Sequence, residues 1–466
     1  MPRPFLVLMA ALLAVAGCAL KKPPEPAEIR KDALPQVAPD RAWARAATPG
    51  DVTAGWLASF QDAQLEALVR EAVTNNPDLR VGATRVEQAA IAVSLAKARL
   101  YPSIGILGRG STKLSDDMST GLSGGIFSVS WEIDLWGRLR YARNAAAETF
   151  ASSQADFEFA RQSIAAATVK SWLGATETLL ERDLATVMVA SAEERVTLAA
   201  KRVEVGAGDD QDVADARADV ASYREGKSQL MLAHEQTLRA LELILGRYPA
   251  AELSARTSLP QFPGPVPAGL PLALLDRRPD MRAAERRVAA AFNRVGEAKA
   301  ARFPTLSLTL SGGYLTSSVL QLKDDYQNPS AGLSGSLFAP LYTGGALKSQ
   351  VDLRTSEQRQ AMAEYARLAL RAIGDVENAL GAERALRERE ELLGSVLAER
   401  QRALALEETA SRVGRSDNRA VLGRRLAVAG SQVALLRVSS ERLAQRVDLY
   451  LALGGGWDAA PPPVTN

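Results

Sequence analysis

The sequence predicts a mainly α-helical protein with a small β part, built by duplication of one long unit. Three observations predict this class: self-similarity at a separation of about 200 residues, two long stretches without proline, and four short segments in which apolar and polar residues alternate. The composition fits a folded chain, because 47% of the 466 residues are hydrophobic and 24% are charged.

The duplication is visible over a long run without a gap. The segment NPDLR at 76–80 is matched 202 positions later by RPDMR at 278–282, and AKA at 96–98 is matched by AKA at 298–300. Further along, the separation becomes 208, where VG at 205–206 is matched by VG at 413–414. This period is far longer than that of solenoid repeats, so the chain contains two copies of one supersecondary unit.

The chain opens with the outline of a secretory signal peptide. Arg3, an apolar run from Phe5 to Val15 and small residues lead to Cys18, the single cysteine. The apolar run is too short for a transmembrane helix. Its end, Val15-Ala16-Gly17-Cys18, resembles the bacterial lipoprotein cleavage box, so we expect Cys18 to be the lipidated first residue of the mature chain. A buried structural cysteine is the alternative, and residues 19–40, with five prolines, are predicted to form an extended tether.

Two proline-free stretches predict very long helices. The chain has 23 prolines, yet none lies between Pro102 and Pro249 or between Pro340 and Pro461, and proline disrupts a helix interior. Residues 138–205 and 346–413 are rich in strong helix formers. About 65 helical residues would extend over roughly 100 Å. A Gly- and Asp-containing break follows each stretch before a shorter helical stretch, so two very long helical hairpins are predicted.

Alternation of apolar and polar residues predicts four strands, at 103–112, 124–135, 305–314 and 333–342. Strands of this length with one apolar and one polar face are typical of outer-membrane barrels. A soluble antiparallel sheet with one solvent-exposed face is the alternative. Four strands cannot close a barrel, so a pore would have to be shared by several chains. The polar loops around 115–123 and 316–330 would then face the cell exterior.

The charged and metal-binding residues make several function classes improbable. With 56 basic and 54 acidic residues the net charge is +2, which predicts no nucleic-acid partner. One histidine, His234, and one cysteine supply too few ligands for a typical metal site, and no cofactor or catalytic residue is predicted. Acidic residues concentrate near one chain break, but acids at a helix start usually act as caps. An enzyme is therefore not expected.

Several motifs together resemble those of the TolC superfamily. They are the paired NPDLR and RPDMR runs, SWEIDLWGR at 130–138, its second-copy counterpart FAPLYTGG at 338–345, and YLALGGGW at 450–457. The resemblance covers Trp56 to Trp457, and the lipoprotein box places the chain nearest to the OprM and NodT-like lipoprotein branch. It implies a homotrimer whose periplasmic hairpins form an α-barrel and whose chains each contribute four strands to a shared transmembrane β-barrel.

The same resemblance implies a function and its partners. The protein would be the outer-membrane channel of a tripartite efflux system, lipid-anchored, and docked to a periplasmic adaptor (membrane fusion) protein and an inner-membrane transporter of the resistance-nodulation-division (RND) type. Two alternatives stay open: the outer-membrane component of a type I protein secretion system, and a structural lipoprotein that braces the periplasm. The predicted organisation is a signal peptide at 1–17, a lipidated tether at 18–55, a first repeat at 56–248, a linker at 249–272, a second repeat at 273–457 and a tail at 458–466.

The two hairpin tips carry opposite charge and form a predicted periplasmic gate. Its residues are Asp209, Asp210, Asp212, Asp215, Arg415, Asp417 and Arg419, with Arg412, Arg424 and Arg425 nearby. By resemblance, Asp212 corresponds to the aspartate that ties the first hairpin to an arginine of the second. Ala420 and Gly423 stand where TolC itself has acidic constriction rings, so the residues of the tightest ring stay open. Simple capping of solvated helix ends is the alternative.

Overall fold

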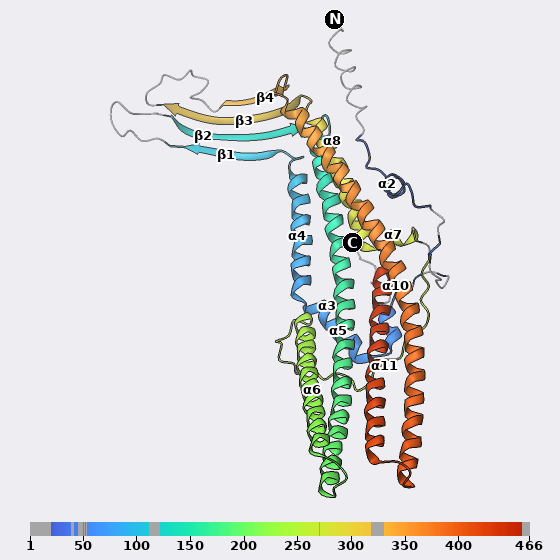
Figure 1. Cartoon of the computed structure of the whole chain (residues 1–466). Helices are drawn as coiled ribbons and strands as arrows, with labels where there is room; N and C mark the ends of the chain where they lie inside the picture. The colour runs from blue at the N-terminus through green and yellow to red at the C-terminus, as the bar shows by residue number, and fades with distance from the viewer. Residues whose placement is uncertain are drawn as a thin grey trace. The chain divides into compact units, whose positions relative to one another are not determined.

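The computed structural model describes residues 20–38, 42–44, 50, 52, 54–110, 122–269, 271–317 and 330–458. It contains long helices and one four-stranded sheet (Figure 1), which confirms the predicted mainly helical class. Chain contacts divide it into two compact units. Unit 1 consists of Met1–Gln36, Thr84–Asp156 and Arg282–Leu368, and unit 2 of Val37–Ala83, Phe157–Met281 and Ala369–Asn466. Each unit takes segments from both repeats, so the repeats are not separate compact bodies.

The duplication holds helix by helix. The paired helices have equal lengths: 22 residues in α4 (Pro77–Ala98) and α8 (Pro279–Ala300), 67 in α5 (Arg138–Glu204) and α10 (Ala346–Arg412), and 35 in α6 (Asp210–Ile244) and α11 (Asn418–Ala452). The two proline-free stretches therefore form the predicted long helical hairpins, α5 with α6 and α10 with α11.

The paired NPDLR and RPDMR motifs connect the start of a helix to the end of a returning helix within unit 2. The Oδ1 atom of Asn76 accepts hydrogen bonds from the first turn of α4, and its Nδ2 donates to the carbonyl of Ile244 at 2.8 Å. In the second copy, Arg278 is buried and its Nη1 donates to the carbonyl of Ala452 at 3.1 Å. Ile244 and Ala452 are the last residues of α6 and α11, so different side chains make the same connection.

The sheet of unit 1 is antiparallel with the order β1-β2-β3-β4, from strands β1 (Ser103–Arg109), β2 (Leu122–Ile133), β3 (Thr305–Ser317) and β4 (Ser330–Phe338). Its register separates two kinds of residue. One row across the four strands is apolar, Ile104, Val129, Leu310 and Leu333, and the adjacent row is polar, Ser103, Ser130, Thr309 and Ser334. Since successive residues of a strand point to opposite faces, the sheet has one apolar and one polar face.

The strand boundaries differ from the predicted ones. The fourth strand covers 330–338 instead of 333–342, because Pro340 cannot donate a ladder hydrogen bond. The first ends at Arg109 instead of 112, the second covers 122–133 instead of 124–135, and the third continues to Ser317 instead of 314. The ends of the two predicted exterior loops belong to strands, namely Leu122, Ser123, Thr316, Ser317 and Ser330. The rest of both loops lies outside the described residues.

The SWEIDLWGR motif forms the junction between β2 and α5 in unit 1. The carboxylate of Asp134 accepts from the backbone N–H groups of Leu139 and Arg140, at 3.1 and 2.9 Å, and so caps the first turn of α5. Trp136 donates from its indole N–H to the carbonyl of Pro304 at 2.7 Å and stacks on Phe303. Junction geometry thus explains the acid and the second tryptophan of the motif, and its glycine, Gly137, has a φ of +78° that other residues rarely adopt.

The segment at 19–40, whose prolines predicted an extended tether, is not extended throughout, because it contains a helix. Residues Pro26–Ala33 form the helix α2, in which Ile29 is buried with 2% of its surface exposed. Pro26 occupies the first helical turn, where its missing N–H leaves no intrahelical hydrogen bond unmade. Cys18 itself lies outside the described residues.

The core of unit 2 is packed from aromatic and aliphatic side chains that come from early and late parts of the sequence. Its shorter helices are η1 (Trp56–Phe60), α3 (Ala63–Asn75) and α7 (Ala273–Arg277). Trp56 stacks on Tyr450 with ring centroids 5.3 Å apart. Trp172 is fully buried and donates to the carboxylate of Asp62 at 3.2 Å. Burial alone would raise the pKa of Asp62, but hydrogen bonds from Leu65 and then Arg256 and Trp172 outweigh it and lower this pKa.

Candidate functional site

The two hairpin tips of unit 2 have the same backbone construction. Each long helix is followed by a glycine with positive φ, +72° at Gly206 and +74° at Gly414. The next N–H turns back onto the helix, from Ala207 to the carbonyl of Arg202 at 2.8 Å and from Arg415 to that of Ala410 at 2.9 Å. This backbone places an aspartate at the start of each returning helix.

Those two aspartates cap the returning helices. Asp209 accepts from the N–H of Asp212 at 2.8 Å, and Asp417 accepts from the N–H of Arg419 at 3.0 Å. Asp417 also accepts from the Nε of Arg419 at 2.9 Å. Hydrogen bonds from the backbone and side chain of Arg419 lower the pKa of Asp417, with the charge of Arg202 adding to the effect. Capping, one of the two readings of the acidic cluster, is therefore present at both tips.

Ion pairs also connect the two tips. The Nη1 of Arg419 lies 4.0 Å from the Oδ2 of Asp212, and the Nη1 of Arg202 lies 3.6 Å from the Oδ2 of Asp417. Arg425 joins Glu194 of the first hairpin at 3.7 Å and Glu408 of its own hairpin at 3.3 Å. We call the pairs Asp212 with Arg419 and Arg202 with Asp417 the tip links. Both are partly exposed, so each is worth about 0–1 kcal/mol.

The structure brings together only some of the predicted gate residues. Asp212, Asp417 and Arg419 take part in the tip links, and Asp209 acts as a cap. Within the described part of the chain, Asp210, Asp215 and Arg415 form no ion pair. Sequence reasoning missed Arg202, although it lies in the last turn of α5, where a cation is favoured by the helix dipole.

Further ion pairs join α5 to α11 above the tips. Lys170 Nζ lies 2.7 Å from Asp448, and Arg437 pairs with Glu181, whose side chain is 5% exposed. Glu177 lies one turn from Glu181, and its burial raises its pKa, against a hydrogen bond from Ser440 that acts in the opposite direction. The two hairpins of unit 2 are thus held together by polar contacts at several levels along their length.

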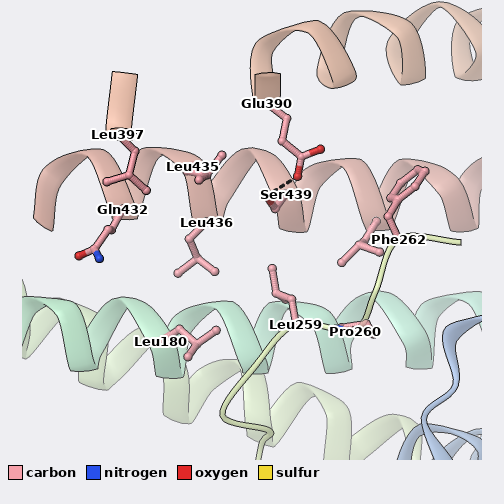
Figure 2. Close-up of a pocket in the computed structure, with 11 residues that line it drawn as sticks. Leu180, Leu259, Pro260, Phe262, Glu390, Leu397, Gln432, Leu435, Leu436 and Ser439 are labelled. Atoms are coloured by element: carbon pink, nitrogen blue, oxygen red, sulfur yellow. Dashed lines mark hydrogen bonds between the residues drawn. The ribbon is translucent and has the colours of Figure 1, made fainter. Parts of the chain in front are cut away.

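The inter-repeat linker crosses this part of unit 2 and leaves a pocket of about 370 Å³ against α5, α10 and α11. Figure 2 shows Leu259 of the linker pointing into the space between α5 and α11, into which Leu180 and Leu436 also point, and Glu390 hydrogen-bonded to Ser439. The ring of Phe262 lies beneath two guanidinium groups, 3.6 Å from that of Arg442 and 4.4 Å from that of Arg446. Arg446 also donates to the carbonyls of Pro263 and Gly264.

Neither a metal site nor a spanning helix is found in the described residues. No group of three or more His, Cys, Asp or Glu side chains there is arranged to hold a metal ion. None of the helices in those ranges combines the length and the apolar character needed to cross a membrane.

The family model for outer membrane efflux proteins matches residues 68–247 and 270–455. The chain belongs to the outer membrane efflux protein family. This membership confirms the resemblance to the TolC superfamily. The efflux protein is 30% identical to the toluene efflux pump outer membrane protein TtgC of Pseudomonas putida, over 98% of this chain and 96% of the relative. It is 28% identical to the outer membrane protein OprJ of Pseudomonas aeruginosa, over 87% of each chain.

Solved structures agree with this assignment of the efflux protein. A membrane protein from Pseudomonas aeruginosa is similar to it with a TM-score of 0.76 and 26% identity, over 92% of this chain and 100% of that chain. The open state of the Neisseria gonorrhoeae MtrE outer membrane channel gives a TM-score of 0.81 at 24% identity, over 95% and 98% of the chains. At that identity the second likeness concerns the fold, which is that of an outer-membrane channel.

Proposed function

We propose that this efflux protein is the outer-membrane channel of a tripartite, RND-type efflux system, a passive homotrimeric conduit that exports small molecules delivered by an inner-membrane pump and a periplasmic adaptor. The name of the relative TtgC, a toluene efflux pump outer membrane protein, supports this role. It favours small-molecule export over the secretion and bracing alternatives.

The observation that carries the proposal is the two-faced sheet of unit 1. Apolar residues of one face are exposed, with Ile106 at 81% and Leu333 at 74%. Exposed apolar side chains on strands of this kind are stable against lipid, whereas the serine and threonine row of the other face suits a water-filled interior. Among the described strands, β1 and β4 each pair on one side only. Pairing of β4 with β1 of another copy, repeated around an axis, would satisfy both edges and close a barrel.

We further propose that Cys18 carries the lipid anchor of the mature chain in the outer membrane. Several acyl chains give essentially permanent membrane residence. Mass spectrometry of the mature N-terminus tests this: an acylated Cys18 is expected, and an unmodified terminus at another residue would refute it.

The tip links belong to the same proposal as a periplasmic gate. Opposite charges would hold the two tips together, through α6 and α11 in one link and through α5 and the cap of α11 in the other, at the level where a helical tunnel would narrow. Rupture of these pairs by an adaptor would then permit opening, and the capping role of Asp209 and Asp417 would stay intact in both states.

One pair of substitutions on neighbouring residues of β3 tests the lipid-facing assignment. Leu310 lies in the apolar row and Thr309 in the polar row. An arginine on the lipid face costs about 2–4 kcal/mol at the bilayer midplane and far less in the interior. We expect Leu310→Arg to abolish or strongly reduce trimers in isolated outer membranes. Thr309→Arg should leave the trimer intact and change its conductance in planar bilayers. Equal effects of the two variants on trimer yield would contradict the proposed orientation.

A further inference from the structure

The first described residues of the chain, Leu20 and Lys21, contact the start of α5. A β-carbon on Gly137 would collide with the side chain of Leu20, so Leu20 occupies the space that this glycine leaves open. The backbone N–H of Lys21 donates to the hydroxyl of Tyr141 at 3.0 Å. The ring of Tyr141 in turn lies against Gly296 of α8, where an added β-carbon would be 2.6 Å from ring atoms. The start of α5 therefore contacts Leu20 and Lys21 directly, and α8 supports this contact through the ring of Tyr141.

The duplication provides an internal comparison for this contact. Gly345, 208 residues after Gly137, has nearly the same backbone, with φ of +86° against +78°. A β-carbon on Gly345 would have no atom within 4 Å. The other two positions also differ between the copies, because Tyr141 is matched by Ser349 and Gly296 by Ser94. The ring of Tyr141, the glycine that leaves room for it and the contact with Leu20 thus occur together in the first copy and are all absent from the matched positions of the second copy.

The segment that follows is packed as well. The N–H of Glu25 bonds to the carboxylate of Glu28 at 3.1 Å at the start of α2. Further along, Ile29 and Leu34 are 2% and 6% exposed. Burial of Ile29 and Leu34, together with the contact of Leu20, is more than a free linker would have.

We infer that the junction of β2 and α5 is a binding site for the mature N-terminus, with Gly137, Tyr141 and Gly296 as its positioning residues. The site binds the apolar side chain of residue 20 and the backbone N–H of residue 21, which donates to the hydroxyl of Tyr141. The consequence for the membrane rests on the proposed lipidation of Cys18. Two residues span at most about 7 Å, so a lipid carried by Cys18 would be attached within that distance of Leu20.

Limited trypsin digestion of the full-length trimer tests the site, because the Lys21–Lys22 bond lies within the bound segment. Proteolysis of a locally opened segment follows the population of the open form. Gly137→Ala should be cleaved at Lys21 at least about tenfold faster than Gly345→Ala, which carries the same left-handed strain without the collision. Tyr141→Phe, which keeps the ring and removes the acceptor, should accelerate cleavage about two- to tenfold.

Further variants separate this site from the lipid anchor. Leu20→Ala should accelerate cleavage by itself, and its effect should not multiply with that of Gly137→Ala, because both remove one contact. Cys18→Ser should leave the protection of Lys21 in place. Equal cleavage of Gly137→Ala and Gly345→Ala, or loss of protection in Cys18→Ser, would overturn the inference. An unacylated mature chain that still shows the expected ratio would remove the lipid anchor and leave the binding site standing.

Discussion

At the scale of single residues, Glu177 on α5 is a carboxyl group for which the fold favours the protonated form. Burial raises its pKa, and the groups facing it are Ser440, Glu181, Arg437 and Glu441. A native pKa above the ordinary value means that the folded state binds this proton more tightly than the unfolded state. Stability from this group is therefore complete below the ordinary carboxyl pKa and is lost as pH rises through the raised one.

Glu177→Gln should stabilise the protein at pH values above that raised pKa, because the amide cannot ionise. The gain should be at most about 1 kcal/mol, since the group is partly exposed and solvent screens its charge. Thermal unfolding midpoints at about pH 8 and about pH 4 measure this, with a gain expected only at the higher pH. Glu181→Gln is the matched comparison, since it removes the partner of Arg437 and should cost about 1–3 kcal/mol. A destabilised Glu177→Gln at the higher pH would show that the ionised carboxylate is the favoured form.

Residue patterns predicted part of the tip chemistry and missed part of it. Asp212 and Arg419 carry opposite charge in the first turns of the two matched returning helices, so their approach was predictable. Arg202 could not be found in this way, because its pairing with Asp417 depends on how α5 packs beside the second hairpin. Glu177 has no sequence signal at all, since a glutamate in a helix rich in charges is usually exposed.

At the scale of elements, the inter-repeat linker is fixed to unit 2 by polar and aromatic contacts. At its start, the carboxylate of Glu242 accepts from the N–H groups of Ala251 and Glu252, at 2.7 and 2.8 Å. At its centre, Phe262 lies against Arg442 and Arg446, of which Arg446 is 1% exposed. A buried guanidinium over an aromatic face is worth about 1–2 kcal/mol. The centre of the linker is therefore attached through the ring of Phe262 and through the hydrogen bonds from Arg446 to the carbonyls of Pro263 and Gly264.

Phe262→Ala should loosen the linker, because it removes both cation–π contacts and opens the adjacent pocket. Hydrogen exchange of amides at 259–266 should rise by about tenfold or more, which corresponds to a loss of about 1.4 kcal/mol. Phe262→Tyr keeps the ring face and should exchange like the parent protein. Amides at the hairpin tips should stay unchanged in both variants, and equal exchange in the alanine and tyrosine variants would exclude the ring as the attachment.

Element types followed from sequence more reliably than element ends. Proline-free stretches rich in strong helix formers predicted both long helices, which have 67 residues each, since such a composition over this length favours a helix. Strand ends depend on cross-strand pairing, so the fourth strand begins at Ser330, opposite Gly313 of β3, where no sequence signal marked it. The helix α2 was hidden by prolines, one of which sits in its first turn, where proline is tolerated.

At the scale of the whole molecule, duplication places two similar hairpins in one unit and gives their tips complementary charge. In the proposed homotrimer, each tip link would occur three times. The small free energies of these ion pairs would add up and stabilise the closed state while leaving its opening reversible. Hydrogen bonds from Arg419 lower the pKa of Asp417, so its charge is kept as pH falls and is lost only below the ordinary carboxyl range. Closure should therefore depend on salt and be nearly independent of pH between about 5 and 8.

Removal of a tip link should favour the open channel. Asp212→Ala and Arg202→Ala each delete one of the two tip links in all three chains of the proposed trimer. A summed loss of about 1 kcal/mol in closed-state stability, roughly 0.3 kcal/mol per exposed pair, raises the ratio of open to closed channels about fivefold. Single-channel recordings in planar bilayers measure this ratio, and cells carrying the variants should become more permeable to large antibiotics.

Arg415→Ala is the matched control, because it removes a tip arginine that forms no ion pair in the described residues and leaves the backbone turn in place. High salt should raise the open fraction of the parent protein towards that of the variants. If Asp212→Ala and Arg202→Ala conduct like Arg415→Ala while their trimers stay intact, the tip charges serve only as helix caps and the constriction lies elsewhere in the tunnel.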